Sequence, residues 1–396
     1  MNNSEDTQQA GRVTVYGLPS VRQATLVTTA AGMEQFMAAA RTESTIAFDT
    51  ESNSLFAYYP RICLIQVSLP GADYLIDPLV ADVDPLDEIF ADPACQKIFH
   101  AAENDILGLK RDFGFTFTNI YDTMLAARIL GWQHAGLAAI LENLHGVTLD
   151  KKMQRTDWGR RPLDAQQLAY AQLDTYFLHD LKDRQEAELR ERGRWQEALE
   201  NFNRLSELEY QNKEFDPEGY WSVPGARDLS PQELAILREL YIFRDQQASR
   251  EDRPPFKIFD NRAMTRVATT QPSTPAELDK KSALAPSVAR RYGSGILSAV
   301  KRGKHAPPPV YRRTSNGNGR PDPKVTARFD ALRKWRTERA QQRGVDPDVV
   351  LTNDQLMSIA RQSPADLDEL ANTGAMGAWK LQEYGPDVLG VLARFE

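Results

Sequence analysis

Residues 44–52, STIAFDTES, join a β-strand pattern to two carboxylates. Successive side chains of a strand point to opposite faces of a sheet, so Asp49 and Glu51 project side by side from one face. Two more strand-like stretches follow, RICLIQVSLP at 61–70 and ADYLIDPL at 72–79. The short connections between the three stretches predict an antiparallel meander.

Helical stretches and short apolar runs alternate after these strands, which predicts a mixed α/β sheet for the first half of the chain. A long helix is expected from Asp164 to about Arg192, because Asp164 and Gln167 have the spacing of a capping box. Gly131 and Gly146 each follow a helical pattern, where a left-handed C-cap is easiest for glycine.

The chain has 396 residues, more than one hydrophobic core usually organises, so two or three domains are expected. Beyond residue 201 the pattern is helical, and two stretches resemble each other, which indicates two copies of one helical module. Three residue pairs are related by a common offset of 92: Pro255 and Pro347, Asn261 and Asn353, Tyr292 and Tyr384. The expected organisation is a flexible tail (1–20), an α/β domain (21–205), a helical domain (206–303), a Pro- and Gly-rich linker (304–323) and a second helical domain (324–396).

Composition restricts the class of protein. No apolar run approaches the ~20 residues that span a bilayer, and the N-terminus has no signal-peptide core, so a cytoplasmic protein without a membrane partner is expected. The two cysteines, Cys63 and Cys95, are interpreted as buried apolar side chains. The net charge is −7, yet residues 301–345 contain thirteen Lys and Arg against three acids. That segment is either a polyanion contact or a solvated linker.

Three acidic motifs carry the candidate chemistry. The paired carboxylates of Asp49 and Glu51 repel each other unless a cation lies between them, and hard divalent ions choose oxygen ligands. Asp105, in HAAENDI at 100–106, lies at a strand-to-helix junction, where functional side chains gather in α/β folds. Taken alone, Asp105, or Glu103 nearby, is better interpreted as an ordinary residue that favours a helix N-terminus.

The third motif is YAQLD at 170–174. Tyr170 and Asp174 are four residues apart on a helix, about 40° around its axis, so the phenol and the carboxylate share one face. Such a pair could serve a water molecule and a metal ion together. Taken alone, it could also be a half-buried tyrosine beside a solvent-facing acid.

Together these motifs resemble the DEDD superfamily of 3′-to-5′ exonucleases, in its tyrosine-containing subgroup. The chain is similar to the ribonuclease D family in particular, through CLIQVS (63–68), YDTMLAARIL (121–130) and QRTDWGRRPL (154–163). The two helical modules resemble HRDC domains, so the resemblance covers nearly the whole chain after the tail. It implies a ribonuclease H-like α/β nuclease domain with a mixed sheet, followed by two all-α HRDC-like domains.

The resemblance also implies roles for five residues. Asp49, Glu51, Asp105 and Asp174 correspond to the family's metal-binding acids for two divalent ions, Mg²⁺ or Mn²⁺, and Tyr170 corresponds to its catalytic tyrosine. The chain departs from many relatives at Ser52, where they carry an aromatic residue, and at the acidic Glu103. Neither departure removes a metal ligand.

The implied function is 3′-to-5′ trimming of tRNA precursors or other structured RNA, with 5′-mononucleotides released. The alternatives are a DNA 3′-to-5′ exonuclease and a catalytically inactive RNA-binding protein. No small-molecule cofactor is expected, and a monomer is the default.

Candidate RNA contacts lie outside the acidic motifs. Trp158 could stack on a base, and four arginines could neutralise phosphates, although a packing role for Trp158 is an equal alternative. The arginines are Arg160, Arg161, Arg312 and Arg313. Three histidines are too scattered for a zinc site and are expected to be structural: His100, His134 and His145.

Overall fold

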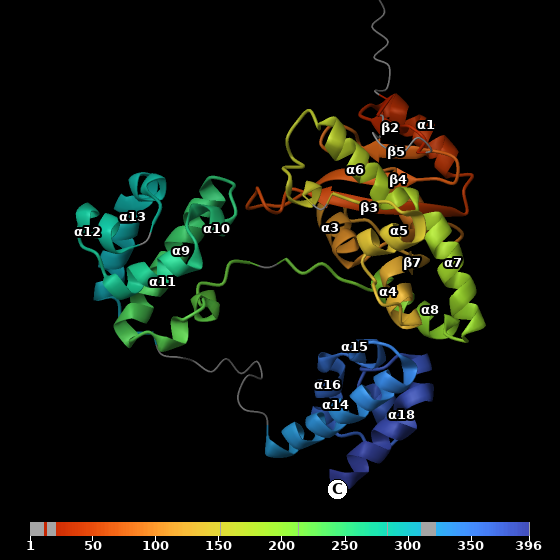
Figure 1. Ribbon diagram of the computed structural model, residues 1–396. Coiled ribbons are helices and arrows are strands. Elements are labelled where there is room, and N and C mark those ends of the chain that lie inside the picture. Colours follow the sequence, from red (N-terminus) through yellow and green to blue (C-terminus); the bar gives the residue numbers. More distant parts are fainter. Residues whose placement is uncertain are drawn as a thin grey trace, which may run out of the picture. The chain divides into compact units, whose positions relative to one another are not determined.

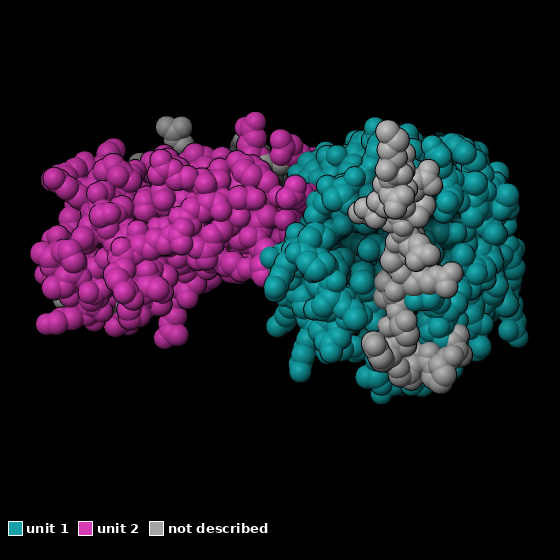
Figure 2. Space-filling view, turned by 90° about the horizontal axis from the view of Figure 1, so that it is seen from above, with its two compact units in different colours: residues 1–51, 62–210, 315–396 teal, residues 52–61, 211–314 magenta. Residues whose placement is uncertain are grey.

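The computed structural model describes residues 12–13, 21–150, 152–212, 214–282, 284–309 and 322–395. The chain divides into two compact units (Figure 2). Unit 1 comprises Met1–Glu51, Ile62–Tyr210 and Ser315–Glu396, and unit 2 comprises Ser52–Arg61 and Gln211–Thr314. Arg312 and Arg313, and most of the expected linker, lie outside the described residues. None of the described helices is both long and apolar enough to cross a bilayer.

A mixed sheet forms the centre of the α/β region, as predicted (Figure 1). Strands β4 and β5 pair antiparallel, whereas β2 with β5, β3 with β6 and β6 with β7 pair parallel. Within the described residues the strand order is β1-β2-β5-β4-β3-β6-β7. The strands are β1 (Arg12–Val13), β2 (Ala24–Val27), β3 (Thr45–Ser52), β4 (Ile62–Ser68), β5 (Asp73–Ile76), β6 (Gln96–Phe99) and β7 (Ile120–Asp122).

Strand β1 lies inside the segment that was expected to be a flexible tail. It pairs antiparallel with β2, where Arg12 is opposite Thr25 and Val13 is opposite Ala24. The backbone N–H and C=O groups along the open edge of β2 can form hydrogen bonds with any extended segment. A prediction made from composition does not take this pairing into account.

Helices pack on both faces of the sheet. They are α1 (Ala30–Ala40), α2 (Leu86–Ala91), α3 (Glu103–Phe113), α4 (Thr123–Leu130), α5 (Leu137–His145), α6 (Ala165–Tyr176), α7 (Leu178–Glu191) and α8 (Trp195–Ser206). Ile46 and Phe48 of β3 enter a core with side chains of α1, α2 and α3. Ala47 enters a different core with side chains of α4, α7 and α8. Because both faces of β3 pack inside the domain, the position of this strand is closely determined.

The long helix expected from Asp164 to about Arg192 is two helices, α6 and α7, which meet at Phe177. The break has no proline or glycine to signal it. Phe177 instead stacks on His145 of α5, with 4.6 Å between ring centroids. The start of the helix is as predicted, because Asp164 and Gln167 form a capping box.

The two helical modules repeat one arrangement, which confirms the internal similarity. The first contains α9 (Pro231–Arg250), α10 (Pro255–Ile258), α11 (Asn261–Thr270), α12 (Pro275–Lys281) and α13 (Pro286–His305). The second contains α14 (Pro323–Arg343), α15 (Pro347–Val350), α16 (Asn353–Gln362), α17 (Leu367–Asn372) and α18 (Ala378–Leu392). In each module a buried arginine at the same position, Arg244 or Arg336, donates to a backbone carbonyl 15 residues further on.

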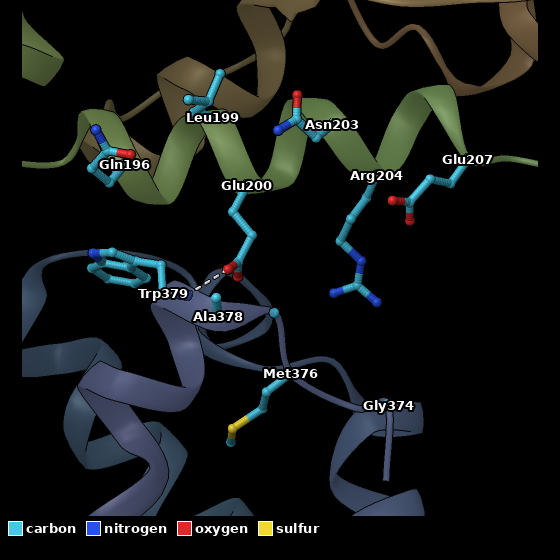
Figure 3. Close-up of a pocket in the computed structure, with 11 residues that line it drawn as sticks. Gln196, Leu199, Glu200, Asn203, Arg204, Glu207, Gly374, Met376, Ala378 and Trp379 are labelled. Carbon is cyan, nitrogen blue, oxygen red and sulfur yellow. Dashed lines mark hydrogen bonds between the residues drawn. The ribbon is translucent and has the colours of Figure 1, made fainter. Parts of the chain in front are cut away.

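The second module belongs to unit 1 and packs on α8. Arg343 of α14 forms an ion pair with Glu197 of α8, whose side chain is 0% exposed. Glu200 of α8 accepts a 2.6 Å hydrogen bond from the backbone N–H of Trp379, at the start of α18 (Figure 3). An anion at a helix N-terminus is favourable, so Glu200 fixes the position of α18. Gly131, a left-handed C-cap as predicted, approaches the backbone of Gly344 so closely that a side chain would collide.

We predict that Arg343→Met lowers the free energy of unfolding by about 3–5 kcal/mol, because it leaves Glu197 buried without its partner. Chemical denaturation measures the loss. The matched control is Arg41→Met, which removes a 2.7 Å ion pair with Glu88 from the exposed surface and should cost nothing measurable. Equal losses in both variants would contradict a docked second module.

Candidate active site

Strand β3 brings the first two acids together. Carboxylate oxygens of Asp49, Glu51 and Asp174 all lie within 4.8 Å of one another. Asp174 belongs to α6, which packs across β4 and β5 (Figure 1). Asp49 and Glu51 are half-buried and Asp174 is buried. Residues more than a hundred positions apart in sequence therefore share one acidic cluster.

Asp105 reaches the same pocket from the first turn of α3. Its Oδ1 accepts hydrogen bonds from the backbone N–H of Thr50 at 3.0 Å and from the Thr50 hydroxyl at 2.5 Å. Thr50 lies between Asp49 and Glu51, so the same strand that carries two acids also positions the third. The remaining carboxylate oxygen of Asp105 has no hydrogen bond from another described residue.

Tyr170 lies one turn before Asp174 on α6, and its hydroxyl is close enough to the Asp174 carboxylate to lower the pKa of that acid. The side chain of Gln154 also lies near the Tyr170 hydroxyl and opposes the rise in its pKa. Gln154 belongs to a single 3₁₀ turn, Met153–Arg155, in the segment before α6. The phenol is thus held between an amide and a carboxylate at the edge of the cluster.

An open pocket of about 540 Å³ contains all five predicted residues. One part of its wall is acidic, and another part is apolar and suits the face of a base. The lining residues are Asp49, Thr50, Glu51, His100, Ala101, Asn104, Asp105, Met124, Gly136, Leu137, Ala138, Ala139, Leu149, Gln154, Tyr170 and Asp174.

Burial is the largest cause of a raised pKa for each of the four acids. Burial is the larger cause for Glu51, whose pKa rises to about 9 with further contributions from the charges of Asp174 and Asp105. Burial and then the charges of the other three acids raise the pKa of Asp49. Burial and then the charge of Asp105 raise the pKa of Asp174, against an opposing interaction with the Tyr170 hydroxyl. Burial raises the pKa of Asp105, against the opposing hydrogen bonds from Thr50.

These residues fit a divalent cation. Among the described residues, no Lys or Arg forms an ion pair with any of the four acids. The charged forms of these carboxyl groups are unfavourable without a positive partner. A cluster of such oxygen ligands therefore suits a hard divalent cation such as Mg²⁺ or Mn²⁺.

The expected RNA contacts are revised by the structure. Trp158 is 0% exposed, so the prediction that it stacks on RNA is wrong; its indole packs in the core beside Tyr170. Arg161 donates to both Asp77 oxygens and to the carbonyls of Trp158 and Cys63, so it serves the fold rather than a phosphate. Arg160 is exposed and stays a candidate.

The sequence did not single out several residues that line the pocket. Thr50, Asn104 and Gln154 touch the site or its five residues, and His100 was expected to be structural. Thr50 and Gln154 lie inside the quoted motifs FDTE and QRTDWGRRPL, so their position next to the acids was the available signal.

Comparison with known proteins agrees with this geometry. Residues 24–190 match the 3′-5′ exonuclease family, and residues 233–300 and 325–392 each match the HRDC domain. The chain is therefore a 3′-5′ exonuclease that carries two HRDC domains. Exonuclease domains of this family depend on metal ions.

Full-length relatives define the family further. The chain is 28% identical to ribonuclease D of Nitrobacter hamburgensis over 92% of this chain and 94% of that protein. It is 29% identical to ribonuclease D of a Jannaschia species over 92% of this chain and 94% of that protein. The crystal structure of Escherichia coli RNase D has the same fold, with a TM-score of 0.66 and 24% sequence identity. The match covers 94% of this chain and 99% of that one. The chain belongs to the ribonuclease D family of 3′-5′ exoribonucleases.

We predict that divalent cations stabilise the protein more at pH 8.5 than at pH 5.5. The pKa of Glu51 is near 4 in the unfolded chain and about 9 in the folded protein. The protonated carboxyl group therefore stabilises the fold at low pH, and this contribution is lost as the pH rises from about 4 toward about 9. Thermal unfolding with chelator should therefore show falling stability over that window. Mg²⁺ at a hundred times its Kd should restore about 2.7 kcal/mol. A cation effect independent of pH would contradict this electrostatic account.

Proposed function

We propose that this protein removes nucleotides one at a time from the 3′ ends of tRNA precursors or other structured RNA and releases 5′-mononucleotides. The observation that supports this most directly is the convergence of Asp49, Glu51 and Asp174 within 4.8 Å, with Asp105 and Tyr170 in the same pocket. The relatives named ribonuclease D support RNA as the substrate.

The four acids would hold two divalent cations, Mg²⁺ or Mn²⁺. Asp49 is the shared ligand in this proposal, Glu51 and Asp174 complete one position, and Asp105 supports the other. When bound, such ions supply positive charge against an anionic phosphodiester. The acids themselves position that charge, and Thr50 prevents the Asp105 carboxylate from rotating.

Tyr170 would orient the attacking water by a hydrogen bond to its oxygen. Burial, and then the nearby acids, raise the pKa of this phenol well above its usual value near 10, so the hydroxyl stays protonated at neutral pH. A protonated phenol cannot act as the general base, but it can donate a hydrogen bond. Gln154 and Asp174 would fix the direction of that donor.

The helical modules would hold the structured body of the RNA while the nuclease domain trims its end. The basic segment at 301–343 contributes less than its charge suggests, because Arg343 is paired with Glu197 and Arg336 is buried. Arg312 and Arg313 remain proposed phosphate contacts, together with Arg160. We also propose that the protein acts in the cytoplasm as a monomer.

Asp49→Asn should abolish Mg²⁺-dependent trimming of a tRNA precursor with extra 3′ nucleotides, because one carboxylate serves both ion positions. Mass analysis of the products measures trimming, and circular dichroism checks the fold. The control is Asp354→Asn, an exposed acid of the second helical module, which should retain the native rate. Persistent trimming by Asp49→Asn would remove that residue from the mechanism.

Tyr170→Phe should lower the rate constant of cleavage at least about a hundredfold, the usual range for a positioned proton donor or acceptor, and leave cation affinity nearly unchanged. Single-turnover kinetics across a Mn²⁺ titration separate these two quantities. A native rate in this variant would show that the phenol does not orient the nucleophile. A matched loss of cation affinity would make Tyr170 a structural support of the acids.

A further inference from the structure

His100 lines the pocket beside the acids, and its ring is fixed in one tautomer. The Thr123 hydroxyl donates its proton to the carbonyl of Phe99 at 3.0 Å. His100 Nδ1 lies 2.9 Å from the same hydroxyl oxygen, so Nδ1 must carry the proton and donate it. The proton is therefore on Nδ1, and Nε2 carries an unshared electron pair.

The backbone around His100 is held rigidly. The buried carboxylate of Asp122 accepts hydrogen bonds from the N–H groups of Ala101 and Ala102, and also from Met124 and Leu125 at the start of α4. Ala101 adopts a left-handed conformation, with a φ of 63°. Strain of this kind in a residue with a side chain is maintained only where surrounding contacts impose it, and it gathers at functional sites.

The Nε2 atom has no partner among the described residues, although its ring is mostly enclosed. Burial lowers the pKa of His100 to about 4, so the ring is neutral at pH 7. When substrate displaces water from the pocket, this neutral acceptor is left unpaired unless the substrate supplies a donor. Phosphate oxygens offer none. Bases offer different donors in different positions, whereas an exonuclease meets the same sugar hydroxyls at every step.

We propose that His100 contacts the substrate, and that its Nε2 accepts a hydrogen bond from a hydroxyl of the 3′-terminal ribose. This inference rests on the proposed function of the pocket and adds a specific contact to it. If the hydroxyl is the 2′ one, His100 helps to distinguish RNA from DNA, because a site built to pair with a hydroxyl disfavours the analogue that lacks it.

Two variants separate the contact from structural support. In His100→Asn the amide N–H can still donate to Thr123, but no atom reaches the position of Nε2. In His100→Gln the amide oxygen can reach that position. The substrates are three single-stranded RNA oligonucleotides that differ only in the last nucleotide, which is a ribonucleotide, a 2′-deoxynucleotide or a 3′-deoxynucleotide.

His100→Asn should trim the ribonucleotide end about three- to tenfold more slowly, the effect of one ordinary hydrogen bond. This loss should vanish on one of the two deoxy ends, which identifies the hydroxyl, and His100→Gln should recover most of the native rate. The native protein should itself be slower on that deoxy end. This last comparison tests the proposal even if the variants fold poorly.

Four outcomes would overturn the contact: an equal loss by His100→Asn on all three ends, no loss on any end, native rates that are equal on all three ends, or no recovery in a folded His100→Gln. A fall in Mn²⁺ affinity in His100→Asn would also overturn it, since His100 would then serve the metal site. If the native protein trims none of the three RNAs, the proposed function itself fails, whereas normal trimming with an unaffected His100→Asn rejects this inference alone.

Discussion

Repulsion among four carboxylates in one half-enclosed pocket is the constraint on which the rest of this structure depends. Burial disfavours each charge, and the neighbouring acids disfavour it further, as the raised pKa of Glu51 shows. No described basic side chain offsets this charge. A fold that gathers such groups without a counter-charge stores an unfavourable free energy that a divalent cation can relieve.

The surrounding fold has to hold these acids in place against that repulsion. Strand β3 does so because Ile46 and Phe48 anchor one face and Ala47 anchors the other. Thr50 then fixes Asp105, and Gln154 lies beside the phenol of Tyr170. The second helical module is part of the same compact unit. A buried ion pair joins Arg343 to Glu197, and Glu200 accepts a hydrogen bond from the backbone at the N-terminus of α18.

The sequence was sufficient to predict the elements that depend on local patterns. The alternation in STIAFDTES predicts the facing pair Asp49 and Glu51, and the four-residue spacing predicts the pair Tyr170 and Asp174. The common offset of 92 predicts two similar helical modules. The equivalent tyrosines of the two modules, Tyr292 and Tyr384, are both buried. The mixed sheet follows from the alternation of strands and helices.

Contacts between distant segments could not be predicted in this way. For Trp158, in a polar loop, the sequence left stacking on RNA and packing in the core as equal alternatives, and only tertiary packing shows that it is buried. Phe177, at the break between α6 and α7, contacts the ring of His145, more than thirty residues earlier. The tautomer of His100 depends on Thr123 and Phe99, and the pairing of Arg343 depends on Glu197. Local propensity contains none of this information.

The most direct test of the central claim is a crystal structure of the protein soaked in Mn²⁺, with the ions located by their anomalous scattering. The account predicts two peaks in the pocket, both within coordination distance of the Asp49 carboxylate and each contacted by at least one further acid. A single peak, or ions bound only away from Asp49, would contradict it.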